Sequence, residues 1–149
     1  RDGKAGVWAL FGAACAVASL ALAFALQAVD GVALKLMVDQ WAHAEEPLRS
    51  QLFAATFGVR QIEAGLAALF GLGFAISLLL YAPALWLSRP APRGLALGVL
   101  LAGGANLLAA LLQGHDGFSE RAMNWSMPAS LLALLWFFWL AVWLWRQPE

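Results

Sequence analysis

The sequence is poor in charge and nearly devoid of cysteine. Only 12% of its 149 residues are charged, against roughly a quarter in ordinary soluble domains. The nine Lys and Arg balance the nine Asp and Glu, and Cys15 is the single cysteine. An internal disulfide is therefore excluded. The zero net charge and the lack of a basic stripe leave no surface suited to nucleic acid.

Catalytic and metal-binding motifs are also missing. The sequence has no phosphate-binding loop, no C-x-x-C or H-E-x-x-H motif, and no Ser/His/Asp set with a meaningful spacing. Both histidines, His43 and His115, lie at or beyond the ends of apolar segments, whereas membrane helices that hold haem use histidines within the span. Asp39, His43 and Glu46 share a helix face, but zinc wants three or four converging ligands. We expect a non-enzymatic protein without a catalytic or metal site and without haem in its spans, and the sequence identifies no other cofactor.

Long apolar runs dominate what the sequence does contain. Hydrophobic residues make up 62% of the chain. Four windows free of Asp, Glu, Lys and Arg each exceed the about 20 residues that cross a hydrocarbon core, and only helices satisfy their own backbone groups there. We expect an all-α membrane protein, with one domain over 1–149 and an antiparallel bundle of four transmembrane helices. The expected spans are about 6–29, 63–88, 94–113 and 127–145.

The longest connection between spans predicts an amphipathic helix over 31–46. Ala33, Met37 and Trp41 recur at helical spacing, while Lys35 and Asp39 belong to the opposite stripe. We expect this segment to lie on the outer membrane surface or to cap the bundle. From about residue 48, a helix can run without a break into the second span.

Charge placement predicts the orientation. The side with both termini and the Pro-rich turn at 88–94 carries five Lys or Arg against two acids, and the other side carries four against seven. By the positive-inside rule the first side is cytoplasmic. We therefore expect a bacterial inner-membrane protein with both termini in the cytoplasm. Its expected partners are the lipid bilayer and other membrane subunits or further copies of itself.

Two hexapeptides indicate an internal repeat. Residues 26–31 and 112–117 both read L-Q-x-x-D-G, and the second and fourth spans both end in Trp followed by Arg. Two duplicated hairpins, related by a pseudo-two-fold axis along the membrane normal, would produce this pattern. Convergence is the alternative, because Asp-Gly commonly ends a helix and Trp followed by Arg is common at an inner interface.

Polar residues at the outer ends of the spans form the candidate site. They are Gln27, Asp30, Arg60, Glu63, Asn106, Gln113, His115 and Asp116. Polar groups at this depth usually face the bundle interior or a wet cavity. We expect one pocket under the amphipathic segment, with Arg60 as its only basic group. The alternative is that these residues snorkel or bond between helices, with Arg60 neutralised by Glu63 or Asp30.

Three motifs carry a resemblance to a protein family. They are Asp30-Gly31-x-Ala33-Leu34-Lys35, Val59-Arg60-x-x-Glu63, and Gly117-Phe118-Ser119 followed by a Trp-rich last helix led by Pro128. Over most of its length the chain resembles small four-span integral membrane proteins of high-GC bacteria, which implies the fold and supplies no active residues. Our leading hypothesis is a non-enzymatic accessory or structural subunit of a larger membrane complex. The alternative is a small carrier or receptor that binds an amphiphilic molecule in an outward-facing pocket.

Overall fold

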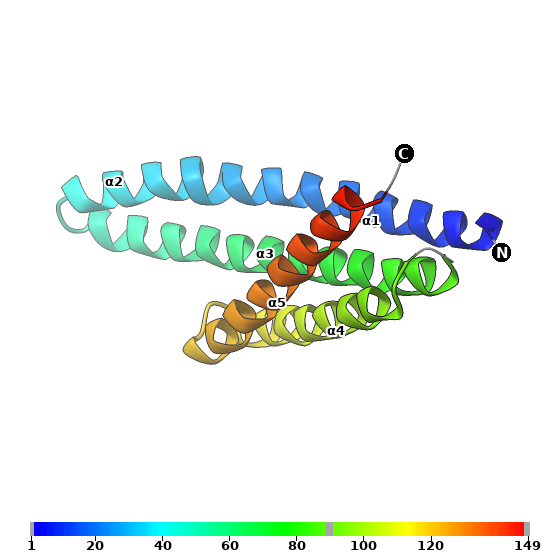
Figure 1. Cartoon of the computed structure of the whole chain (residues 1–149). Helices are drawn as coiled ribbons and strands as arrows, with labels where there is room; N and C mark the ends of the chain where they lie inside the picture. The colour runs from blue at the N-terminus through cyan, green and yellow to red at the C-terminus, as the bar shows by residue number, and fades with distance from the viewer. Residues whose placement is uncertain (1, 89–90, 148–149) are drawn as a thin grey trace.

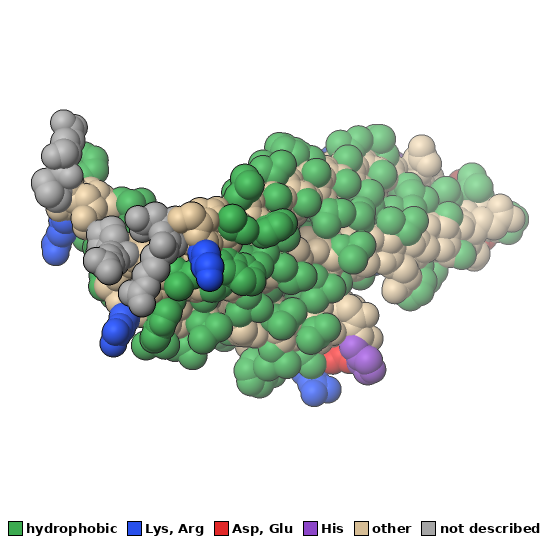
Figure 2. All heavy atoms as spheres, turned by 90° about the vertical axis from the view of Figure 1, so that its right-hand side faces the viewer, with side chains coloured by type: hydrophobic (Ala, Val, Ile, Leu, Met, Phe, Trp, Pro, Cys, Tyr) green, Lys and Arg blue, Asp and Glu red, His purple; other side chains and the backbone are tan. Residues whose placement is uncertain are grey.

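The computed structural model describes residues 2–88 and 91–147, and all its regular structure there is helical. The elements are α1 (Asp2–Ala28), η1 (Val29–Leu34), α2 (Lys35–His43), α3 (Leu48–Leu87), α4 (Arg93–Asp116) and α5 (Glu120–Trp145). Four helices are long and apolar enough to cross a membrane: Gly3–His43, α3, α4 and α5. Hydrophobic side chains cover most of the face seen in Figure 2. The predicted all-α, four-span architecture is confirmed.

The first helix is much longer than a membrane span requires. α1, the π-helical turn η1 and α2 form one rod, because no proline interrupts the chain before Pro47. The expected amphipathic segment is helical over Val29–His43, but it extends the axis of α1 and packs along α3 (Figure 1). It therefore does not fold across the bundle as a cap.

α3 is an unbroken helix of 40 residues, as expected from residue 48 onward. At 1.5 Å per residue it is about 60 Å long, against about 36 Å for the 24 residues of α4. α2 and the first part of α3 consequently extend past the α4–α5 turn (Figure 1). We call residues 33–59 the protruding hairpin, and we call the opposite end, where α1 begins and α5 ends, the terminal end.

The four long helices pack as an open row. α3 lies between α1 and α4, and α5 packs on α4 and crosses it obliquely (Figure 1). Among the described residues, α1 makes no close backbone approach to α4 or α5. The core lies between the middle parts of α3, α4 and α5, where Leu78, Leu95, Val99 and Trp136 are buried. One side of α3 and α4 is therefore left uncovered beside α5.

Small residues allow the close contacts within this row. A Cβ atom on Gly103 of α4 would lie 2.9 Å from Cγ of Leu79, and one on Gly71 of α3 would lie 3.0 Å from Cβ of Ala110. On the other side of α3, the Ser77 hydroxyl donates a hydrogen bond of 2.8 Å to a backbone carbonyl of α1. Glycine and alanine therefore let α3 and α4 approach closely around the larger core side chains.

The two L-Q-x-x-D-G segments fold differently. Gly31 lies inside η1 and the helix continues, whereas Asp116 ends α4 and Gly117 follows with φ 63°. A two-fold axis relating the hairpins would place α1 against α5 as it places α3 against α4, and this approach is absent from the described residues. The expectation of a symmetric duplication is therefore not met, because the shared motif ends a helix in only one of its two places.

Candidate functional site

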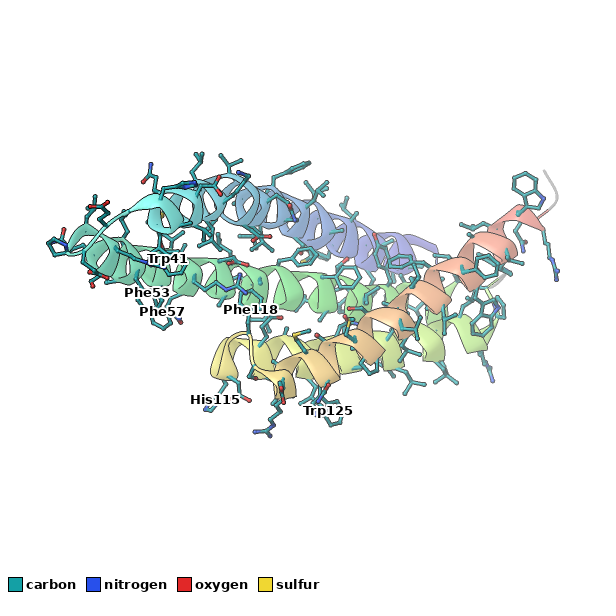
Figure 3. The ribbon with its side chains drawn as sticks, turned by 90° about the vertical axis from the view of Figure 1, so that its left-hand side faces the viewer. Trp41, Phe53, Phe57, His115, Phe118 and Trp125 are labelled. Carbon is teal, nitrogen blue, oxygen red and sulfur yellow. The ribbon has the colours of Figure 1, made fainter. Side chains whose placement is uncertain are left out.

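A cleft opens where α3 passes the α4–α5 turn. It has a volume of about 460 Å³ and is lined by Phe57, Arg60, Gln61 and Ala64 of α3 and by residues 115–119 of the turn. In Figure 3, Phe57 and Phe118 lie on the side of α3 that faces this turn. We call this recess the turn cleft. It combines charged groups with aromatic rings.

Arg60 is the basic group of the turn cleft. Its Nη1 donates to both carboxylate oxygens of Glu63, at 2.8 and 2.6 Å. The Glu63 side chain is only 5% exposed, whereas that of Arg60 is 44% exposed. The guanidinium also lies 4.4 Å from the centre of the Phe118 ring, a cation–π contact. Arg60 therefore neutralises a buried carboxylate and attaches the turn to α3.

Asp116 is the acidic group of the turn cleft. His115 Nδ1 lies 2.5 Å from Asp116 Oδ1, and Arg121 Nη1 lies 3.7 Å from Oδ2. Ser119 caps α5, since its hydroxyl oxygen accepts the Ala122 N–H at 3.1 Å. The helix end, the glycine turn and the cap together hold Asp116 opposite α3.

A second recess, which we call the groove, opens between α3, α4 and α5 and has a volume of about 470 Å³. Small residues and the rings of Phe70, Phe74 and Phe137 line it. Ring centres are 6.1 Å apart for Phe70 and Phe74 and 6.2 Å apart for Phe74 and Phe137. Its polar lining residues are Asn106, Gln113, Ser126 and Ser130. The groove is thus aromatic, with a few hydrogen-bonding groups.

The turn cleft and the groove follow one another along the same two helices. Ala64 lines the cleft and Ala67, about one turn further along α3, lines the groove. On α4, Gln113 lines the groove and Asp116 lines the cleft. One elongated molecule could therefore contact both recesses.

The structure separates the eight predicted site residues into three groups. Arg60, His115 and Asp116 line the turn cleft, and Glu63 is buried beside Arg60. Asn106 and Gln113 line the groove, while Gln27 and Asp30 are exposed and line neither recess. The expected single pocket under an amphipathic lid is thus two recesses without that lid, because α2 continues along α3.

The structure identifies the partners of Arg60 and Asn106, for which the sequence left alternatives open. Arg60 pairs with Glu63 rather than with Asp30. Asn106 is buried, and its Nδ2 donates to the carbonyl oxygens of Ala102 at 2.8 Å and Ala129 at 2.9 Å. Asn106 therefore ties α4 to α5, as the interhelical alternative predicted.

Sequence reasoning missed the aromatic residues of both recesses. Phe70 and Phe74 are four residues apart and so share a helix face, a signal that could have placed them together. Phe118 was noted only as part of a family motif, and its position over Arg60 depends on the α4–α5 turn. Aromatic residues in apolar spans are common, so the type of residue alone did not indicate a site.

The described residues contain no group of three or more His, Cys, Asp and Glu side chains able to hold a metal ion. On α2, the Asp39 carboxylate pairs with Lys35, and the His43 ring bonds the Asp39 backbone carbonyl at 2.7 Å. Comparison with protein-family models, curated proteins and solved structures finds no match. The turn cleft thus offers charged groups and aromatic rings, and the groove offers aromatic rings with a few polar side chains.

Proposed function

We propose that this protein is a carrier or receptor that binds an amphiphilic small molecule along α3, α4 and α5. The observation that carries the proposal is the succession of the turn cleft and the groove along the same helices. One end has charged groups for a polar head, and the other has Phe70, Phe74 and Phe137 for an apolar tail. Each recess falls within the range of about 300–1,000 Å³ typical of small-molecule sites.

The polar lining of the groove supports this function. Ser130 is exposed, Gln113 is half-buried, and neither side chain has a hydrogen-bond partner in the part of the chain that the structure describes. In hydrocarbon, an unpaired polar group is costly. A bound amphiphile with a carbonyl or hydroxyl group near its head, such as the ester carbonyls of a phospholipid, would supply the missing partner.

The protein is proposed to lie in a bacterial inner membrane with both termini in the cytoplasm. Lys4, Arg93 and Arg146 are at the terminal end, which the positive-inside rule assigns to the cytoplasm. α4 is about 36 Å long, so its other end reaches the far boundary of a hydrocarbon core of about 30 Å. The turn cleft would then open at the outer interface, where polar heads reside.

Photo-crosslinking in lipid nanodiscs tests the binding function. The probe is a phosphatidylcholine with a diazirine in its acyl chain, and labelled peptides are mapped by mass spectrometry. We expect labelling concentrated around Phe70, Phe74 and Phe137. Ser130→Phe should reduce this labelling severalfold by filling the groove. Leu131→Phe is the matched control, because Leu131 is exposed on the same helix and does not line the groove. Equal labelling of all apolar helix faces, unchanged by Ser130→Phe, would refute the proposal.

A second candidate is a non-enzymatic accessory subunit of a larger membrane complex. The observation that favours it is the protruding hairpin, where Leu36, Phe53 and Phe57 are each more than half exposed beside charged side chains. Exposed apolar patches often mark protein contacts. Purification in a mild detergent followed by mass spectrometry should then recover a stable partner or a self-associated form. A chain that runs alone would count against this candidate.

A further inference from the structure

We infer that the turn cleft is a headgroup site for zwitterionic amphiphiles, which carry an anionic group and an ammonium group. The inference rests on the proposed amphiphile binding and adds the chemical class of the head. It depends on three features of the cleft: its charge balance, the free donors of Arg60, and its aromatic rings.

The ionised side chains of the turn cleft balance one another. Arg60 and Asp116 line it with opposite charges, and their respective partners are Glu63 and Arg121. A ligand with a net charge would leave this boundary region unbalanced. A zwitterion places its anionic group at Arg60 and its cationic group at Asp116, so both charges are matched.

Arg60 keeps hydrogen-bonding capacity for an anionic group. Arginine has five N–H donors, and both contacts with Glu63 use Nη1. Among the described residues, Nε and Nη2 have no hydrogen-bond partner. The cation–π contact with Phe118 restrains the guanidinium, whose planar fork suits recognition of a phosphate or carboxylate.

Asp116 and two aromatic rings can bind the ammonium group of such a ligand. The Arg121 contact of 3.7 Å with Oδ2 is too long for a strong hydrogen bond, so Oδ2 stays available while the exposed His115 contacts Oδ1. Phe57 is 58% exposed and Phe118 is 40% exposed. Both line the cleft, and aromatic faces attract ammonium groups. The site therefore accepts primary and quaternary ammonium heads.

The position of the turn cleft indicates a lipid as the source of this head. The groove begins about one helical turn away on α3 and can hold an acyl chain. A water-soluble phosphoethanolamine has the same charges but no tail for the groove. We therefore expect a lipid to bind, and the soluble compound serves to distinguish the two sources.

Native mass spectrometry of the full chain, after delipidation in detergent, tests the inference. The probes are phosphatidylethanolamine, phosphatidylcholine and phosphatidylglycerol with identical acyl chains, added in equal amounts. We expect the two zwitterionic lipids to be retained over phosphatidylglycerol by about tenfold, or about 1.4 kcal/mol. Millimolar phosphoethanolamine should not displace them. Displacement would overturn the lipid source and assign the site to a soluble zwitterion.

Two variants assign the selectivity to the cleft. Asp116→Asn should bring the ratio of zwitterionic to anionic lipid close to one. Arg60→Gln combined with Glu63→Gln removes the guanidinium without stranding a buried carboxylate, and it should lower retention of all three lipids. Arg49→Gln is the matched control, because Arg49 stacks on Trp41 at 4.9 Å in the protruding hairpin. It should leave retention and the lipid ratio unchanged.

The outcomes separate this inference from the proposed function. Equal retention of the three lipids by the native chain, with all three reduced by Ser130→Phe, overturns the zwitterion site and leaves amphiphile binding standing. Retention unaffected by Ser130→Phe overturns both. An unchanged lipid ratio in a folded Asp116→Asn variant, judged by circular dichroism, also overturns the headgroup site.

Discussion

Gly103 and Gly104 are neighbours on α4 with opposite surroundings, and replacing each by Ala tests the α3–α4 contact. A Cβ atom on Gly103 would lie 2.9 Å from Cγ of Leu79 and 3.1 Å from its backbone nitrogen, whereas one on Gly104 meets no atom within 4 Å. A backbone nitrogen cannot rotate aside as the end of a side chain can. Gly103→Ala must therefore push α3 and α4 apart, while Gly104→Ala adds a methyl group in open space.

Gly104→Ala is the reference against which the loss of stability in Gly103→Ala is judged. Replacing Gly by Ala inside a helix stabilises it by about 1 kcal/mol, and this contribution is common to both variants. Overpacking a tight interface costs about 1–3 kcal/mol. We therefore expect Gly104→Ala to raise the free energy of unfolding by up to about 1 kcal/mol. Gly103→Ala should be less stable than Gly104→Ala by about 1–3 kcal/mol.

Steric trapping in detergent micelles measures these free energies of unfolding, with far-UV circular dichroism to verify helix content. Because both variants add the same methyl group at adjacent helical positions, helix propensity affects them alike. The difference between them isolates the packing against Leu79. Equal shifts in the two variants would refute the close approach of α3 and α4 at Gly103.

Three further predictions concern individual contacts. Arg60→Ala should lower the free energy of unfolding by about 2 kcal/mol, less than the 3–5 kcal/mol for a fully buried pair, because Arg60 is 44% exposed. Adding Glu63→Gln should recover most of that loss. A double-mutant cycle that shows no coupling energy between the two positions would contradict the Arg60–Glu63 ion pair. Gly117→Ala should lower the free energy of unfolding by about 1–3 kcal/mol, since the backbone of Gly117 has φ 63° and ψ −146°. Gly31→Ala, in helical backbone with open space around it, should be neutral or stabilising. Equal melting temperatures of the two glycine variants would argue against the different backbone conformations at Gly31 and Gly117. Trp136→Phe should lower the free energy of unfolding by about 1 kcal/mol, because Nε1 of Trp136 donates a hydrogen bond of 2.9 Å to a backbone carbonyl of α4. A variant that unfolds at the native denaturant midpoint would show that packing alone holds the ring.

The helices themselves were predictable because their causes are local. Apolar runs of sufficient length and the lack of charge between residues 64 and 88 indicate a span wherever that segment packs. The continuous α3 follows from the absence of proline between Pro47 and Pro83, and Pro83 is accommodated within the helix. These properties belong to segments of the chain, so neighbouring helices were not needed to infer them.

The candidate site was predictable in depth along the helices but not in direction around them. The similar level of Arg60 on α3 and Asp116 on α4 follows from counting residues along each helix away from the connection between α3 and α4. Which side of a helix meets a neighbour depends on the packing of the whole row. Asn106 consequently bonds the Ala129 carbonyl of α5, and Phe118 rather than an amphipathic lid covers Arg60.

The two Asp-Gly pairs show which features of the fold have local causes and which depend on helix packing. Their location at the ends of apolar segments could be read from the residues alone, since hydrophobicity and charge are properties of the residues. Helix packing, in contrast, made the helix continue through Gly31 and end before Gly117. Glycine permits either backbone conformation at little cost. The contacts of the next helix therefore select between them: η1 and α2 pack along α3, whereas α5 turns back to pack on α4.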